Sequence, residues 1–226
     1  MVILRHYFFI GALFISCKNS NMDLTANLQQ ASQFLSQIDD DWANLIENVG
    51  ECKLTFKPER SPYEALVRGV AYQQLHARAG DAIIKRFLAI YDNAFPTPNQ
   101  LLATEFDALR ACGFSGRKIE TIKGIAEGAL SGLVPSRLDA DALPDEELIK
   151  RLIELKGIGR WTVEMLLIFT LERLDVLPAD DFGVVEGYKR LKHLESAPNR
   201  KQIAEIGKVW SPYRTIASWY LWRVPK

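Results

Sequence analysis

Apolar residues recur every three or four positions from Met22 onward and almost nowhere alternate strictly with polar ones. This spacing is typical of amphipathic helices and not of strands. It predicts a first helix that reaches Ile38, closed by the acidic run of residues 39–41, and a second helix over residues 42–49. The fold class predicted for the chain is therefore all-α.

Start and stop signals place the other helices. Ser61-Pro62-Tyr63-Glu64 offers a capping Ser, a Pro in the first turn and a Glu at the capping-box position, so a helix is expected from here through Tyr72. A loop is expected over residues 51–60. The pattern places further helices over residues 81–91, 99–111, 117–130, 145–154, 160–171, 201–206 and 212–222, with another beginning after Asp181.

Composition sets only wide limits on the number of domains and on the kind of partner. The chain has 226 residues, 48% of them hydrophobic, which is enough for one large domain or two compact lobes. The 28 basic residues balance the 28 acidic ones, so overall charge does not indicate a nucleic-acid partner. Residues 151–226 carry 13 of the basic residues against 9 acidic ones, an excess that ordinary surface variation also explains.

Cysteine usage excludes several classes of site. Cys17, Cys52 and Cys112 are odd in number, and no two of them stand at metal-ligand spacing. A disulfide scaffold, a zinc site and a four-cysteine iron–sulfur cluster are not expected, and no metal is expected to be held by side chains.

The first residues allow two interpretations. Arg5 and His6 precede the apolar run of residues 7–15, and Cys17 follows, which is the outline of a signal or lipoprotein segment. The alternative is an extension upstream of the true start at Met22, where the amphipathic pattern begins. We prefer the second interpretation and expect residues 1–21 to be an extension of a helical domain over residues 22–226.

Two glycines one residue apart precede an apolar helix in Leu155-Lys156-Gly157-Ile158-Gly159-Arg160-Trp161-Thr162. Glycines permit a tight hairpin that exposes backbone N–H groups at a helix N-terminus. These donors and the helix dipole suit a phosphate group. A plain interhelical turn explains the same two glycines.

A second feature is the acidic pair in Leu177-Pro178-Ala179-Asp180-Asp181-Phe182-Gly183, where a loop containing proline delivers two carboxylates to the start of a helix. Either carboxylate could serve only as a helix cap. One of them can also cap the helix while the other faces a cleft.

These segments resemble the helix-hairpin-helix glycosylases, and within them the bacterial and yeast-type 3-methyladenine DNA glycosylases. Tyr72 to His76, Gly113 to Lys118 and Pro212 to Trp222 extend the resemblance over most of residues 61–222. It implies two helical lobes, one of about residues 61–170 and the other of residues 22–60 with 171–226. Damaged double-stranded DNA would cross the cleft between them, with Asp181 at the seam.

The resemblance also implies the chemistry. The second acidic residue of the pair is catalytic in the family, which places that role on Asp181. Bifunctional relatives carry a lysine where this chain has Trp161, so hydrolysis by water without strand cleavage is expected. No cofactor is expected, although the family's hairpin carbonyls permit a monovalent cation.

Alkylated purines such as 3-methyladenine and 7-methylguanine carry positive charge, which aromatic faces attract. Trp161 and Trp222 resemble the family's aromatic cage, and Phe182 is a candidate for a third wall. Met165, one turn beyond Trp161, is a candidate for the pocket lining. Core packing is the competing explanation for each of the two tryptophans and for Met165.

DNA contacts are expected from three segments. Leu75 resembles the apolar wedge that fills the gap left by a flipped base, with Gln74 and His76 beside it. The remaining expected contacts lie in the hairpin and at one more helix start: Gly157, Ile158, Gly159, Arg160 and Thr162, and Ser115, Arg117 and Lys118. Otherwise Leu75 would be a core leucine and His76 a surface residue.

Three rival hypotheses stay open from the sequence. The first is a DNA-binding helix-hairpin-helix protein without activity, and the second is a glycosylase for uracil, hypoxanthine or oxidised guanine. The third is a surface lipoprotein, which depends on residues 1–21 alone. The preferred hypothesis is a cytoplasmic, nucleoid-associated monomer that does not bind membranes.

Overall fold

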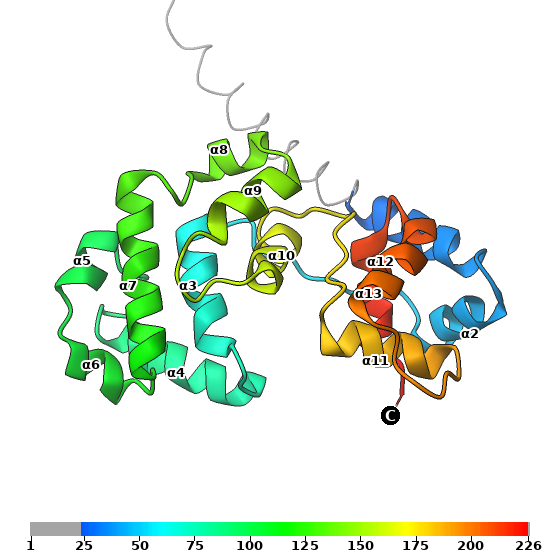
Figure 1. The fold of residues 1–226 in the computed structure, drawn as a ribbon, viewed down its shortest axis with the longest axis horizontal. Coiled ribbons are helices and arrows are strands. Elements are labelled where there is room, and N and C mark those ends of the chain that lie inside the picture. Colours follow the sequence, from blue (N-terminus) through cyan, green and yellow to red (C-terminus); the bar gives the residue numbers. More distant parts are fainter. Residues whose placement is uncertain (1–23, 226) are drawn as a thin grey trace, which may run out of the picture. The chain divides into compact units, whose positions relative to one another are not determined.

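The computed structural model describes residues 24–225, and over that range the chain is helical with no strand. The signal-like run and Cys17 lie outside the described residues. The chain divides into two compact units, one of Thr55–Pro178 and one that joins the residues up to Leu54 to those from Ala179 onward (Figure 1). No helix within the described range is long and apolar enough to cross a bilayer.

The unit of Thr55–Pro178 is a helical bundle around α3, which is buried on several sides. Ser61 caps this helix by accepting a hydrogen bond from the Glu64 N–H at 3.2 Å, as the sequence predicts. The helices of this unit are α3 (Pro62–Tyr72), α4 (Ala77–Ala89), α5 (Pro98–Ala103), α6 (Phe106–Ala111), α7 (Gly116–Ser131), α8 (Arg137–Ala142), α9 (Asp145–Leu152) and α10 (Arg160–Phe169).

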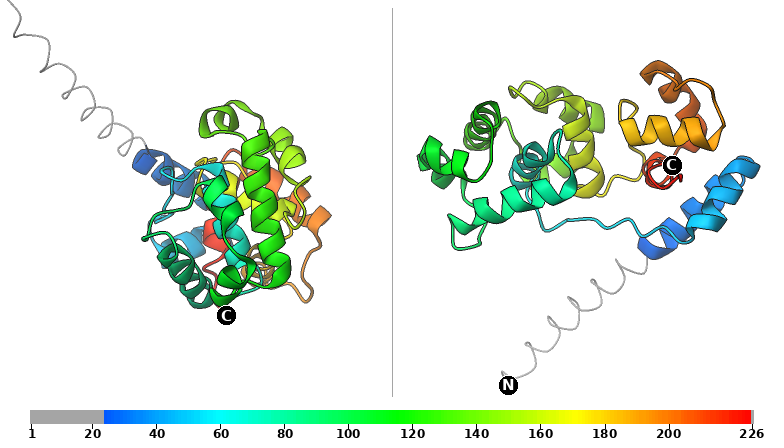
Figure 2. Two further views of the ribbon diagram at one scale, coloured as in Figure 1. Left: turned by 90° about the vertical axis from the view of Figure 1, so that its left-hand side faces the viewer. Right: turned by 90° about the horizontal axis from the view of Figure 1, so that it is seen from below.

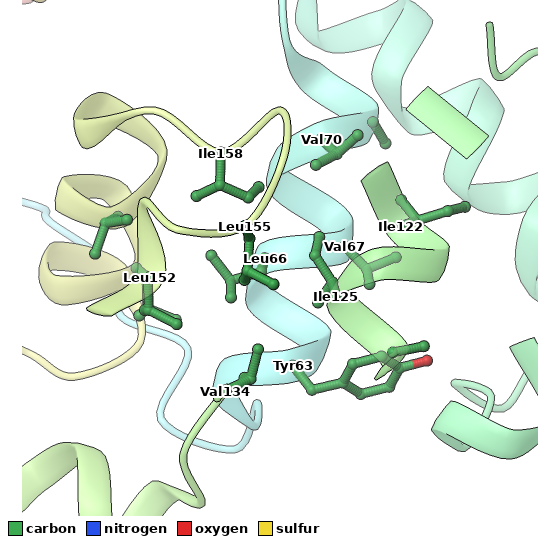
Figure 3. Packing of buried hydrophobic residues seen from close by; sticks show 14 of the residues in the cluster. Tyr63, Leu66, Val67, Val70, Ile122, Ile125, Val134, Leu152, Leu155 and Ile158 are labelled. Carbon is green, nitrogen blue, oxygen red and sulfur yellow. The ribbon is translucent and has the colours of Figure 1, made fainter. Parts of the chain in front are cut away.

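Helix α3 packs against α4, α7 and α10 (Figure 2). Leu66, Val67 and Val70 are fully buried and face side chains of α7, such as Ile122 and Ile125, in the core (Figure 3). Leu155 and Ile158, on either side of the predicted hairpin glycine, enter the same core. The hairpin is thus anchored to the most buried part of its unit.

The other unit contains a helix over residues 24–36 and the helices of the C-terminal third. Trp42, Trp210 and Tyr220 fill its core. On its surface, Lys192 Nζ lies 2.6 Å from Asp39 Oδ1 and 2.8 Å from Asp41 Oδ2. The remaining helices are α2 (Asp40–Val49), α11 (Phe182–Leu191), α12 (Arg200–Ile206), a 3₁₀ turn η1 (Gly207–Trp210) and α13 (Arg214–Leu221).

Several predicted helix limits are wrong. Helix α4 begins at Ala77, four residues before the prediction, because its first turn is exposed and offers no apolar periodicity. The single helix predicted over residues 99–111 is α5 and α6, because Thr104 adopts extended backbone. Its hydroxyl donates to the Gln100 carbonyl at 2.8 Å, which holds the break.

Two further differences concern caps and short helices. The acidic run of residues 39–41 starts α2 and does not close the preceding helix, since Asp39 accepts a hydrogen bond from the Trp42 N–H. Helix α8 is absent from the prediction because it has six residues, of which only Ala140 is buried. Its start is fixed by the Ser136 side chain, which accepts from the Asp139 N–H.

The limits of the two units also differ from the expected lobes. Residues 55–60 and 171–178, expected in the other lobe, belong with Thr55–Pro178. The Lys57 N–H donates to the Phe169 carbonyl at the end of α10, and the Arg173 guanidinium donates to the Asp141 carbonyl. These bonds fasten both connecting segments to the bundle.

Gly187 provides a test of the packing of α11 on α13. A Cβ at this position would lie 2.1 Å from the Leu221 carbonyl oxygen, a backbone atom that cannot move freely. We expect Gly187→Ala to lower the free energy of unfolding by about 1–3 kcal/mol. Gly124, inside α7, has open space at the same position. Gly124→Ala is therefore the control, with an expected gain of about 0.5–1 kcal/mol. Denaturant unfolding measures both, and equal effects would contradict the packing described.

Candidate functional site

The connection between α9 and α10 is a tight hairpin. Gly157 has φ +87°, and a Cβ there would lie 2.2 Å from Thr121 Oγ1, so both backbone angle and space require glycine. Ile158 is buried beneath the hairpin, as expected for a residue that contributes only its backbone. Gly159 is the exposed N-cap of α10 and provides no capping side chain. The start of α10 therefore suits an anion, as predicted.

Arg160 has a role that the sequence analysis missed. Its Nε donates to Glu164 Oε1 at 2.8 Å, and its guanidinium also binds Glu146 of α9. The hydrogen bonds with Glu146 and Glu164 hold the pKa of Arg160 above its ordinary value. The guanidinium expected to contact DNA is instead paired within the unit, where it fastens α10 to α9.

Thr162, also expected at the DNA surface, is buried. Its hydroxyl accepts a hydrogen bond from Gln73 Nε2 at 3.2 Å. The same amide nitrogen donates to the Gly157 carbonyl at 3.2 Å. Thr162 therefore joins the hairpin to the end of α3, and Gln73, absent from the predicted contacts, is the linking residue.

The segment after α3 presents the predicted wedge. Gln74 has φ +56°, which turns the chain sharply after Tyr72. Leu75 follows with 42% of its surface exposed, a high value for a leucine in a folded unit, and His76 is exposed as the N-cap of α4. Leu75 is thus not the core leucine of the competing interpretation.

The start of α7 holds the other predicted contact group. Ser115 caps the helix by accepting from the Lys118 N–H at 3.3 Å, and Arg117 is exposed. Lys118 points inward: its Nζ donates to the Ala71 carbonyl at 3.1 Å and to the Gln73 carbonyl at 2.9 Å. Burial lowers the pKa of this ammonium group. Lys118 therefore holds the end of α3, a role that the sequence analysis did not predict.

A hollow of about 370 Å³ opens beside the start of α10. Trp161 and Met165 both line it, so the structure brings two of the predicted base-pocket residues together in one unit. Tyr72 and Phe169 add aromatic surface. Three basic side chains that the sequence analysis did not place here also contribute: Lys57, Arg60 and Arg68.

Asp181 is placed at the start of α11 in the other unit. Its Oδ1 accepts a hydrogen bond from the Val184 N–H at 2.9 Å and another from Trp222 Nε1 at 2.8 Å. A Cβ at Gly183 would lie 2.6 Å from Trp222 Cδ1, so glycine at this position admits the indole. The carboxylate is partly exposed and held in a fixed orientation.

The structure also shows which acidic residue caps α11. Asp181 is the cap, whereas the exposed Asp180 forms an ion pair with Arg200 at 3.3 Å. The sequence left open which of the two carboxylates caps the helix, and the structure assigns the cap to Asp181. An N-cap side chain can accept from a backbone N–H and still expose part of its carboxylate, so the cap leaves the predicted catalytic role of Asp181 possible.

The remaining predicted pocket residues belong to the unit of Asp181. Trp222, at the end of α13, is half-buried and binds Asp181 through its ring nitrogen. Phe182 is 78% exposed at the first position of α11. Its large exposed ring suits stacking, and a role as a third wall stays a prediction.

Neither described cysteine belongs to a metal site. Cys52 and Cys112 are buried free thiols, and burial raises the pKa of Cys52 to about 11. Among residues 24–225, no group of three or more His, Cys, Asp or Glu side chains could hold a metal ion.

Comparison with known proteins identifies a family and named relatives of this chain. Residues 67–212 match the family model described as HhH-GPD superfamily base excision DNA repair protein. The chain is 46% identical over 210 residues to DNA-3-methyladenine glycosylase 1 of Schizosaccharomyces pombe, covering 90% of each protein.

Two solved structures are also similar to this chain. A 3-methyladenine DNA glycosylase of Schizosaccharomyces pombe in complex with abasic DNA superposes with a TM-score of 0.82, covering 86% of this chain and 95% of that one at 46% identity. A DNA-3-methyladenine glycosidase from Bacillus halodurans gives a TM-score of 0.73 at 36% identity, covering 84% and 86%. The hairpin between α9 and α10 and the carboxylate that caps α11 thus lie in a chain that belongs to the HhH-GPD superfamily of base excision DNA repair proteins.

Proposed function

We propose that the protein is a monofunctional DNA glycosylase that hydrolyses the N-glycosidic bond of alkylated purines, such as 3-methyladenine and 7-methylguanine, in damaged duplex DNA. The observation that carries this proposal is the carboxylate of Asp181, held by the Val184 N–H and by Trp222 Nε1. Relatives named 3-methyladenine DNA glycosylases match nearly the whole chain and supply the substrate class.

The reaction requires charge stabilisation more than acid catalysis. An alkylated purine is already cationic, so it leaves as a neutral base with the electrons of the glycosidic bond. Positive charge then develops on the sugar, and a preoriented carboxylate stabilises it without reorganising. Water adds its oxygen to C1′ of the sugar and releases a proton. Asp181 supplies the negative charge and orients that water.

No strand cleavage belongs to this mechanism. A lyase step needs an amine that attacks the sugar and forms a Schiff base. The corresponding position after Arg160 is Trp161, which lines the hollow instead. The product is therefore DNA with an abasic site and an intact backbone.

DNA binding is proposed to use the backbone of Gly157 to Gly159 on one phosphate and the exposed Arg117 and Ser115 on another. Leu75 fills the gap left by the flipped nucleotide, with Gln74 and His76 beside it. We propose that the protein acts as a monomer without a redox or organic cofactor, and that the hairpin carbonyls are the place for any monovalent cation.

A second class of lesion is favoured by the basic lining of the hollow. Lys57, Arg60 and Arg68 repel a cationic base, and only Arg68 is paired, with Glu64 at 2.8 Å, among the ion pairs of the described residues. Their N–H groups are suited to the carbonyl oxygen of a neutral purine such as hypoxanthine. Trp161 and Tyr72, in contrast, favour a cation through their ring faces. The relative excision of charged and neutral lesions decides between the two classes.

The proposed function is tested with duplexes that each carry one lesion: 7-methylguanine, 3-methyladenine (or a stable analogue), hypoxanthine, uracil or oxidised guanine. We expect release of the alkylated purines to leave abasic sites that break only after alkali. Breaks before alkali would contradict the assignment of no lyase activity. Binding to DNA without release of any base would favour a protein that binds DNA but has no enzymatic activity.

Asp181→Asn isolates the charge of the catalytic group. The amide oxygen of Asn can still accept from Val184 and Trp222, so the fold and DNA affinity should persist. We expect the single-turnover rate of base release to fall at least about 100-fold, as when a preorganised electrostatic contact is removed. Asp180→Asn, which removes only an exposed ion pair, is the matched control and should change the rate little. An essential Asp180 with a dispensable Asp181 would overturn the assignment.

Trp161→Leu tests recognition of charge by the hollow. Leucine keeps an apolar wall but removes the ring that attracts cations. We expect excision of 7-methylguanine to fall about 2- to 30-fold further than that of hypoxanthine, the equivalent of about 0.5–2 kcal/mol. Mutant-to-wild-type ratios under single-turnover conditions correct for the greater intrinsic lability of cationic lesions. Equal ratios for both lesions would show that Trp161 only fills space.

A further inference from the structure

The end of α3 is held by an unusual contact. The last carbonyls of a helix have no partner within it, and here two of them, of Ala71 and Gln73, accept hydrogen bonds from Lys118 Nζ at 3.1 and 2.9 Å. Lys118 lies in the first turn of α7, far away in sequence. Neither of these acceptors is a carboxylate. The ammonium group therefore holds the backbone at the start of residues 73–76, the wedge segment that carries Leu75.

Gln73 connects this point to the hairpin. Its carbonyl is held by Lys118, while its side-chain amide donates to the Gly157 carbonyl and to Thr162 Oγ1. One residue therefore ties the segment that carries Leu75 to the hairpin proposed to bind phosphate. The position of the Leu75 segment relative to the hairpin is thus fixed by hydrogen bonds of one residue, Gln73.

The next residue shows why such fixing is needed. Gln74 adopts φ +56°, a left-handed conformation that costs a non-glycine residue free energy and persists only when its surroundings impose it. Leu75, Gln74 and His76 are exposed and offer little packing of their own. The turn is closed by the Leu75 N–H, which donates to the Tyr72 carbonyl at 3.1 Å, and it ends at His76, the N-cap of α4. Side-chain hydrogen bonds restrain it at its beginning, at Gln73.

We propose that Lys118 is a positioning residue for base flipping, which holds the carbonyls of Ala71 and Gln73 so that Leu75 is presented in register with the hairpin. The inference rests on the proposed function for the wedge and goes beyond it. Lys118 acts through the segment 73–76 and makes no contact with DNA phosphate.

Helix α7 contains a matched control. Lys123 Nζ donates to the Leu102 carbonyl at 3.2 Å and to the Thr104 carbonyl at 2.9 Å, holding the end of α5 as Lys118 holds the end of α3. Both lysines therefore bind the same kind of backbone group from the same helix. Only Lys118 is next to the wedge segment.

The test compares Lys118→Met with Lys123→Met, Lys118→Arg and Leu75→Ala. Methionine keeps an unbranched apolar chain and removes the donors, whereas arginine keeps donors. Three quantities are measured: affinity for undamaged duplex across salt concentrations, affinity for a duplex with a tetrahydrofuran abasic analogue, and the single-turnover rate of 7-methylguanine release. Thermal unfolding monitors stability.

We expect Lys118→Met to reduce the preference for the abasic duplex, and to slow base release, by about tenfold, the size expected when a hydrogen bond from a charged donor is lost. Affinity for undamaged duplex and its salt dependence should not change. Lys118→Arg should restore most of the preference, and Lys123→Met should keep it at a comparable loss of stability. Combined with Leu75→Ala, Lys118→Met should add little, because both act on one contact.

Two results for Lys118→Met would overturn the proposal. A weaker undamaged complex, with a salt dependence reduced by about one charge, would make Lys118 a phosphate contact. Equal losses of preference in Lys118→Met and Lys123→Met would reduce its role to general stability.

The same measurements distinguish a failure of the proposed function from a failure of the inference about Lys118. A wild-type protein that releases no alkylated base would refute the glycosylase assignment, while the abasic preference would still test Lys118. If Leu75→Ala kept the full preference for the abasic duplex, Leu75 would not be the positioned wedge. The inference about Lys118 would then be refuted even if the wild-type protein released alkylated bases.

Discussion

Helix ends carry backbone groups that the helix itself cannot satisfy, and the way these groups are partnered organises both units of this protein. Asp181 partners the start of α11, and this hydrogen bond fixes the orientation of the carboxylate to which we assign the catalytic role. Lys118 partners the end of α3 and holds the segment of Leu75. The start of α10, at Gly159, has no capping side chain and is suited to a phosphate. Short helices supply many such ends, and each of these three holds or presents a residue that the proposed function uses.

The sequence predicts features that depend on neighbouring residues. Ser61 and Pro62 fix the start of α3, and the spacing of Gly157 and Gly159 fixes the hairpin, because caps and tight turns are formed within a few residues. The resemblance to a family adds the position of Asp181, which no local rule provides. The ends of α3 and the hairpin accordingly lie where they were expected.

Contacts between distant segments could not be predicted in the same way. Arg160, Thr162 and Lys118 are all polar residues in the first turn of a helix, and each was expected to contact DNA. Their partners, Glu146, Gln73 and the carbonyls at the end of α3, become neighbours only when the bundle is folded. The spacing of Arg160 and Glu164 on one helix face was the single visible signal of this pairing. Pocket residues such as Lys57 and Arg60 come from a loop with no periodic pattern and gave no signal.

The proposed double role of Asp181, as helix cap and catalytic carboxylate, has an evolutionary consequence. Asp, Asn and Ser are all suitable caps, so selection for folding alone does not require an aspartate at the start of α11. A descendant that lost base excision could keep an aspartate here, or exchange it for asparagine at little cost in stability.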